Sequence, residues 1–309
     1  MVTQTESAPA AAVPGEAMIE THGLRKTFKA RGRTVEAVAG VDLAVRAGEI
    51  FGFLGPNGPG KTTTLRMLAT LLPPDGGSAR IAGCDLRTEP RRVRERIGYV
   101  GQAGGTTPMA TGRGELVLQG RLYGMSKAQA RARAAELLAM VELEAAADRP
   151  TKTYSGGQRR RLDVALGLAH RPRVLFLDEP TTGLDPQSRA HLWDEVRALH
   201  RSGVTIFLTT HYLDEADALC DRVAIIDEGR IVAEGTPPSS SAGSRATSSR
   251  SASRAGRGRR WTCCEAARSC ARPQSRVGAC ASTWIAASRR RPRSCGCSTA
   301  PASASTPSR

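Results

Sequence analysis

The strongest constraint on the fold of this chain is the stretch GPNGPGKTT, residues 55–63. It fits the pattern Gly, four residues, Gly-Lys and Ser/Thr, which is typical of a phosphate-binding loop. An apolar run at residues 49–54 predicts a strand before the loop, and residues 62–72, which contain no Gly or Pro, predict a helix after it. This order of strand, loop and helix directs a helix N-terminus at the bound phosphates.

Each residue type in the loop has a task in nucleotide binding. Glycines let successive backbone N–H groups turn toward phosphate oxygens, Lys61 reaches the outer phosphates, and the Thr62 hydroxyl is a ligand for Mg²⁺. A glycine-rich turn without a ligand would explain the loop alone, but not the motifs found further along the chain. We expect the nucleotide to be held by Gly55, Asn57, Gly58, Gly60, Lys61, Thr62 and Thr63.

Two further apolar runs end in ionisable residues. Residues 174–177 are followed by Asp178 and Glu179, and a second run at 204–209 leads to His211. Such runs predict buried parallel strands, whose C-terminal ends meet at one edge of a sheet. Asp178 there would hold Mg²⁺, and Glu179 would accept a proton from an attacking water. The structural alternatives are two acids that cap the turn before Pro180 and a histidine without a chemical role.

The remaining chain predicts two additions to this parallel sheet. Short runs at 18–21, 35–38 and 41–45 have the partial alternation of antiparallel strands, and the exposed aromatic Phe28 lies among them. Residues 115–147 are helical in pattern with a break at 124–126, where Ser126 can cap the second helix. The fold class is therefore α/β, with an antiparallel β subdomain and an all-helical insertion at about 103–160.

Together these motifs resemble the ATP-binding subunit of ABC transporters over residues 18–237. GPNGPGKTT resembles the Walker A loop, YSGGQ at 154–158 the ABC signature, VLFLDE at 174–179 Walker B, and GLD at 183–185 the D-loop. Gln102 falls at the Q-loop glutamine, His211 at the switch histidine and Phe28 at the adenine-stacking aromatic. The sequences IGYVGQ and YSGGQRRRLDVALGL are most similar to those of the antibiotic and daunorubicin-resistance exporter group.

The resemblance implies a P-loop NTPase core that binds and hydrolyses ATP with Mg²⁺. It implies catalytic roles for Glu179, His211 and Gln102, and metal contacts from Thr62, Gln102 and Asp178. It also implies a head-to-tail dimer in which each ATP lies between the Walker A loop of one copy and the signature of the other. The ATP contacts carried over outside the Walker A loop are Phe28, Ser155, Gly156, Gly157, Gln158 and Asp185.

The resemblance further implies a membrane permease encoded separately, through which the chain lies at the cytoplasmic face of the membrane and drives export of a drug or antibiotic-like compound. The rival hypothesis is a soluble ABC ATPase that acts on ribosomes or nucleic acid. Such relatives carry a second cassette, a coiled coil or a zinc module, which this sequence lacks. Nucleic acid is not an expected partner, because 13 of the 16 net positive charges lie in residues 238–309.

Two residues depart from the family pattern. Pro59 replaces a small residue of the Walker A loop and removes a backbone N–H. If relatives use that amide, its loss weakens ATP binding by roughly 1.5–3 kcal/mol, or about 10- to 100-fold. Gly114 stands where the pattern has Glu, so the first insertion helix is expected to begin less firmly.

The two ends of the chain differ in composition from its middle. Residues 1–17 are rich in Ala, Pro, Ser and Thr and predict a disordered leader. Residues 238–309 contain 14 Arg, six of the eight Cys and no Leu, Phe or Tyr, which predicts a disordered tail. This bias is what GC-rich codons produce out of frame, so a frameshifted reading is one hypothesis for the tail. A catalytically impaired, truncated product is a third reading of the whole chain.

Overall fold

The computed structural model describes residues 16–30, 33–56 and 58–237. The predictions for residues 238–309, for nearly all of the leader and for Asn57 therefore lie outside the described residues. One boundary was wrong. The leader was expected to extend to Ala17, but Ala17 begins a strand and pairs with Arg46.

The central element is a six-stranded sheet with the order β10-β9-β3-β8-β7-β6. Its neighbours run parallel except for the antiparallel pair β9 and β10. The predicted buried strands are confirmed in three of these, although β9 and β10 were not predicted. The strands are β3 (Ile50–Leu54), β6 (Ile97–Val100), β7 (Val174–Asp178), β8 (Thr205–Thr210), β9 (Arg222–Asp227) and β10 (Arg230–Gly235).

The second sheet is antiparallel, with the order β2-β1-β4-β5. It confirms the predicted antiparallel subdomain, but its first two strands are much longer than expected. Register shifts interrupt the β1–β2 pairing at several points, and each shift resets the alternation of apolar and polar residues. A prediction from alternation alone therefore cut the first strand short, at 18–21, and divided the second into 35–38 and 41–45. The strands are β1 (Ala17–Ala30), β2 (Arg33–Arg46), β4 (Gly76–Ile81) and β5 (Cys84–Asp85).

The helices agree with the predicted order, including the helical insertion and its break before Ser126. Ser126 and Gln129 form a reciprocal capping box at the start of the second insertion helix, as its sequence predicts. The helix after the phosphate loop begins earlier than expected, at Pro59, and ends at Leu68, shortly before Thr70 with its positive φ. The helices are α1 (Pro59–Leu68), α2 (Pro90–Arg96), α3 (Gly112–Leu122), α4 (Lys127–Met140), α5 (Gly156–Gly167), α6 (Pro186–Arg201) and α7 (Leu213–Leu219).

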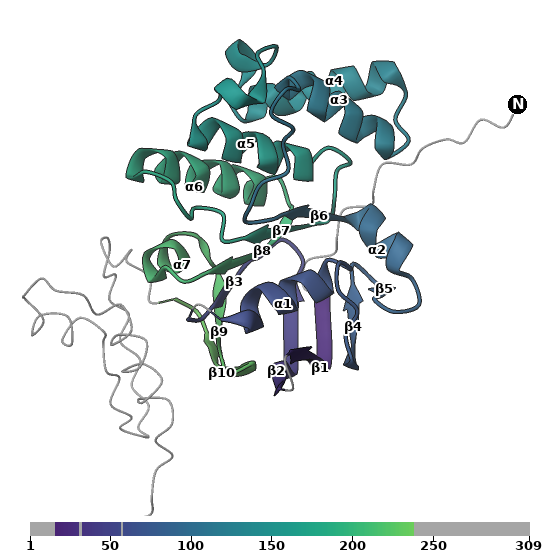
Figure 1. Cartoon of the computed structure of the whole chain (residues 1–309), viewed down its shortest axis with the longest axis vertical. Helices are drawn as coiled ribbons and strands as arrows, with labels where there is room; N and C mark the ends of the chain where they lie inside the picture. The colour runs from purple at the N-terminus through teal and green to yellow at the C-terminus, as the bar shows by residue number, and fades with distance from the viewer. Residues whose placement is uncertain (1–15, 31–32, 57, 238–309) are drawn as a thin grey trace, which may run out of the picture. The chain divides into compact units, whose positions relative to one another are not determined.

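The six-stranded sheet separates two hydrophobic cores. Along β3, Ile50 and Leu54 face the core shared with α3 to α7, whereas Phe51 and Phe53 face the core shared with α1 and the antiparallel sheet. This alternation follows from the two-residue period of a strand. Figure 1 shows the resulting layers, with the helices α3 to α6 on one side of the sheet and α1 on the other, beside β1 and β2.

Candidate functional site

The loop between β3 and α1 approaches the sheet so closely that one of its positions requires glycine. A Cβ at Gly55 would lie 2.4 Å from the Ile226 backbone oxygen of β9. Lys61 follows in the first turn of α1, is 2% exposed, and donates from Nζ to the carbonyls of Gly55 and Pro56 at 2.8 Å each. Burial lowers the pKa of Lys61, while Glu179 and Asp178 oppose this shift by favouring the ammonium form.

Asp178 ends β7 and is almost completely buried. Its Oδ1 accepts hydrogen bonds from Thr62 Oγ1 at 3.2 Å and from Thr209 Oγ1 at 2.7 Å. Its Oδ2 is buried and has no hydrogen-bond partner among the described residues. A buried carboxylate oxygen without a donor, beside a threonine hydroxyl, is the oxygen-rich environment that suits a hard cation such as Mg²⁺.

Glu179 follows directly in a left-handed backbone conformation, with φ of 45°. This conformation is uncommon for a residue with a side chain. Its backbone N–H donates to Thr209 Oγ1 at 3.0 Å and lies 3.1 Å from the Thr209 carbonyl oxygen. The Thr209 side chain therefore holds both acids in place, because the same hydroxyl that accepts from Glu179 donates to Asp178.

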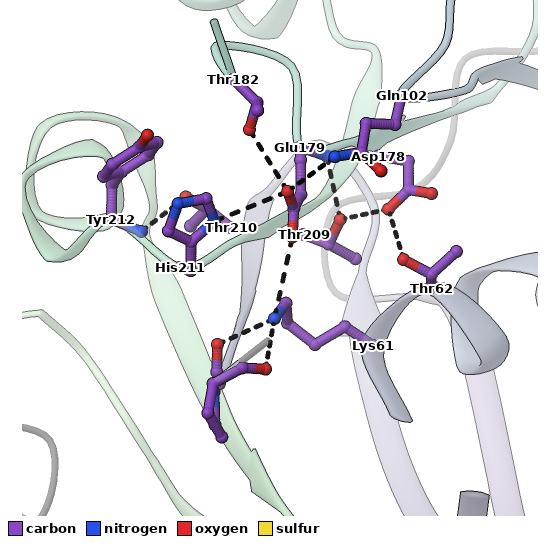
Figure 2. Close-up of polar contacts among 12 residues, drawn as sticks. Lys61, Thr62, Gln102, Asp178, Glu179, Thr182, Thr209, Thr210, His211 and Tyr212 are labelled. Carbon is purple, nitrogen blue, oxygen red and sulfur yellow. Dashed lines mark hydrogen bonds and ion pairs between the residues drawn. The ribbon is translucent and has the colours of Figure 1, made fainter. Parts of the chain in front are cut away.

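Side chains from several segments of the chain surround the carboxylate of Glu179, as Figure 2 shows. Its Oε2 accepts hydrogen bonds from Gln102 Nε2 and Thr182 Oγ1, both at 3.2 Å, and lies 3.5 Å from His211 Nδ1. Its Oε1 lies 3.8 Å from Lys61 Nζ. The structure thus brings together six residues predicted for the site: Lys61, Thr62, Gln102, Asp178, Glu179 and His211.

The predicted signature residues lie apart from this cluster. Ser155 and Gln158 form a reciprocal capping box at the start of α5, and Ser155 and Gly156 are exposed. Within the described residues, none of the hydrogen bonds or ion pairs joins residues 155–158 to the cluster around Glu179. Gly157 instead approaches α6, where a Cβ would lie 2.6 Å from Ser188 Oγ, and this hydroxyl donates to Asp185 at 2.6 Å.

The remaining predicted residues have mixed surroundings. Phe28 lies on β1, is 39% exposed, and has Lys26 Nζ 5.8 Å from its ring centre. Pro59 is the first residue of α1, where proline fits a helix because the N–H there has no partner within the helix. At the start of α3, Thr111 Oγ1 accepts from the Gly114 N–H at 3.0 Å, but Gly114 has no side chain to return the bond as Gln129 and Gln158 do in their capping boxes, so a less firm start of α3 stays a prediction.

Family comparison agrees with this geometry. The family model described as ABC transporter matches residues 38–182. The chain is 49% identical over 226 residues to the daunorubicin resistance ATP-binding protein DrrA2 of Streptomyces coeruleorubidus, a match that spans 73% of this chain and 67% of that protein. The chain belongs to the ABC transporter family. The resemblance stated from the motifs is confirmed.

Other ABC relatives give the same picture. The daunorubicin/doxorubicin resistance ATP-binding protein DrrA of Streptomyces peucetius is 57% identical over 218 residues, which span 71% of this chain and 65% of that protein. The chain thus spans just under two thirds of that relative's length. A Nod factor export ATP-binding protein of Paraburkholderia xenovorans is 46% identical over 222 residues, which span 72% of each chain.

Solved structures confirm the ABC cassette fold. A dimeric ATP-binding cassette in a post-hydrolysis state, bound to ADP and Pi, superposes with a TM-score of 0.66 at 28% identity. The match covers 71% of this chain and 98% of that one. In the part of the chain that the structure describes, no helix has the length and apolar character needed to span a bilayer.

Three residues of this ABC site were not predicted. Thr182 and Thr209 bind the two acids, and Arg160 donates to the backbone around them. The run of three arginines after the signature did not indicate which of them points inward. Thr209 offered a weak signal, because it is a polar residue near the end of a fully buried strand next to β7.

Proposed function

We propose that this protein is the ATP-binding and hydrolysing subunit of an exporter, and that it powers a separate membrane permease. The observation that carries the proposal is the convergence of Lys61, Gln102 and His211 on the Glu179 carboxylate, directly beside Asp178. A proton acceptor, a cation and an oxygen-rich metal environment at one sheet edge are the requirements for phosphoryl transfer to water. The names of the relatives support export as the process that hydrolysis drives.

ATP and Mg²⁺ are the proposed ligands. The N–H groups of the loop before α1 would hold the phosphates, with Lys61 turning from the Gly55 and Pro56 carbonyls to the outer phosphate oxygens. Thr62, Asp178 and Gln102 would hold the metal, and the buried Oδ2 of Asp178 supports this assignment. Bound Mg²⁺ supplies a positive charge that neutralises the charge developing on phosphate oxygens.

Glu179 is the proposed general base. It accepts a proton from the attacking water at one carboxylate oxygen while Gln102 and Thr182 donate to Oε2 and hold the carboxylate. His211 lies at the same oxygen and is the proposed sensor of the terminal phosphate. Phe28, exposed on β1, is the proposed stacking surface for adenine.

A second copy of the chain completes the proposed site. Ser155 and Gly156 are exposed at the N-terminus of α5, where a hydroxyl and free N–H groups can bind phosphate from a facing subunit. Ser188 lies against Gly157, and its hydroxyl donates a hydrogen bond to Asp185. Asp185 therefore belongs to the same facing surface. The dimeric cassettes of similar fold support this arrangement. Association with the permease would then place the protein at the cytoplasmic face of the membrane.

A mixing experiment tests both hydrolysis and the head-to-tail arrangement. Full-length Glu179→Gln and Ser155→Arg proteins are each expected to be nearly inactive when assayed with the permease. A mixed dimer holds one doubly defective site and one site with an intact Glu179 and an intact Ser155. Random mixing in equal amounts forms about half mixed dimers, so we expect about a quarter of the wild-type rate if the sites work independently.

The result has clear alternatives. A mixture that stays as inactive as its components would contradict the head-to-tail arrangement, provided that mixtures of wild type with Ser155→Arg show that a dimer with one intact site is active. Full activity of the Glu179→Gln protein alone would remove Glu179 from the role of general base. A wild-type protein that hydrolyses no ATP with its permease would refute the proposed function.

A further inference from the structure

Arg160 is a buried arginine that no role in nucleotide binding explains. It lies on α5, five residues after Ser155, and is 7% exposed. Its guanidinium donates to three backbone carbonyls: Nε to Pro180 at 2.8 Å, Nη1 to Gly101 at 2.6 Å and Nη2 to Asp178 at 3.1 Å. The rigid fork of an arginine suits such a set of fixed acceptors, whereas a lysine ammonium cannot reproduce it.

The three carbonyls belong to the two segments that carry the proposed catalytic side chains. Gly101 directly precedes Gln102, while Asp178 and Pro180 flank Glu179. One guanidinium therefore joins the backbone of both segments, next to the point where Gln102 Nε2 meets Glu179 Oε2. A shift of Arg160 would change the relative position of these two side chains.

Asp163, almost one helical turn further along α5, holds the other end of the same loop. Its Oδ1 accepts a hydrogen bond from the Gly105 N–H at 2.9 Å. The loop passes so close that a Cβ at Gly104 would lie 2.8 Å from Asp163 Oδ2, and Gly104 has φ of 73°. Residues 101–105 are thus attached to α5 at both ends.

The burial of this arginine needs a reason, because taking a charge out of water is unfavourable unless it is compensated. Burial lowers the pKa of Arg160, and the neighbouring acids Asp163, Asp178 and Glu215 oppose this shift. The three carbonyls satisfy donors that would otherwise be unpaired. A helix could pack on this sheet with an apolar residue at the same place, so the arginine indicates a requirement for fixed backbone positions.

We infer that Arg160, assisted by Asp163, is a positioning residue that sets Gln102 against Glu179 and ties both to helix α5. The inference rests on the proposed function, and it adds a consequence. Because Ser155 begins the same helix, a nucleotide bound by Ser155 in the facing site acts through Arg160 on the Glu179 of the chain's own site. The two ATP sites of a dimer are linked in this way.

The test compares turnover and binding in the full-length protein with its permease. We expect Arg160→Ala to lower kcat by about 10- to 100-fold, the usual effect of misplacing a catalytic group, with ATP affinity changed less than threefold. Arg160→Lys, which keeps the charge without the fork, should fall between Arg160→Ala and wild type. In a Glu179→Gln background the same Arg160→Ala change should have little further effect, because it acts through Glu179.

Arg133→Ala is the matched control. Arg133 also donates to backbone carbonyls of the α5 segment, Leu168 and Ala169, but at its far end. We expect this variant to lose thermal stability while its kcat stays at the wild-type value. If Arg160→Ala does not fold, Arg160→Lys decides the question, measured alone and in the Glu179→Gln background.

The outcomes separate this inference from the proposed function. Equal kcat in wild type, Arg160→Ala and Arg160→Lys would overturn the inference and leave the proposed function intact. Additive losses in the Glu179→Gln background would also overturn it, because a structural role alone produces them. A wild-type protein without ATPase activity would overturn the proposed function and this inference with it.

Discussion

The cluster around Glu179 and the segment Ser155–Gln158 differ in how completely one chain builds them. The cluster is cross-linked by hydrogen bonds from β7, β8 and α1, and Lys61, Asp178 and Thr209 at its centre are buried. Among the residues that the structure describes, the side chains of this segment hydrogen-bond only within its own helix cap, and Ser155 is exposed. The difference teaches that one chain fixes the cluster around Glu179 on folding, whereas Ser155–Gln158 stays a surface segment, which in the proposed dimer would face a second copy.

Substitution of Glu179 is the strongest test of the cluster around this residue. We expect Glu179→Gln to lower turnover by about 10²–10⁴-fold, because a positioned general base contributes that much. ATP affinity should stay close to wild type, since Gln keeps the shape of the side chain. Steady-state hydrolysis and equilibrium nucleotide binding measure the two effects. A variant with wild-type turnover would show that the cluster is structural.

A pH titration of stability separates folding from catalysis, using a residue outside both regions. Burial raises the pKa of Glu195 on α6 to about 8 from its ordinary value of 4.5, and Arg161 only partly opposes this. The folded protein thus holds a proton that the unfolded chain releases. This stabilisation is fully present below about pH 4.5 and is lost as pH rises through about 8.

The expected loss is on the order of 5 kcal/mol in the free energy of unfolding. Chemical denaturation at several pH values measures it. Glu195→Gln should remove this slope without changing the pH profile of turnover. A slope that persists in the variant would assign the proton to another group.

Replacement of Pro59 tests whether the phosphate loop before α1 lacks a backbone N–H donor to ATP. Pro59→Ala restores a backbone N–H at the start of α1, so we expect ATP to bind about 10- to 100-fold more tightly. Calorimetry on both proteins measures the change. Equal affinity would mean that this amide is not used, or that the fixed φ of proline already suits the helix start.

Two serine caps give the smallest effect and the sharpest contrast. Ser155 and Ser126 each form a capping box, on α5 and α4. Substitution of either by Ala should lower the free energy of unfolding by about 1 kcal/mol, which denaturant titration measures. Only Ser155→Ala should also lower turnover. Equal turnover in the two variants would mean that the Ser155 segment is a helix cap and no more.

Much of the site could be predicted from the sequence because its chemistry is encoded locally. The phosphate loop, the two acids at the end of β7 and the histidine after β8 each follow an apolar run, and parallel strands bring the residues at their C-terminal ends to a common edge. The helix caps at Ser126 and Ser155 are likewise local. These are interactions between residues close in sequence, so their spacing alone indicates them.

Only the tertiary structure decided which polar residues lie between these motifs. Arg160 is one of three consecutive arginines, and it is buried because α5 packs against β6 with that face inward. Thr209 and Thr210 are the same residue type, but successive side chains of a strand point to opposite faces. The hydroxyl that reaches Asp178 is that of Thr209. The lengths of β1 and β2 also depend on pairing across bulges. Such features arise from contacts between distant segments, which local pattern does not specify.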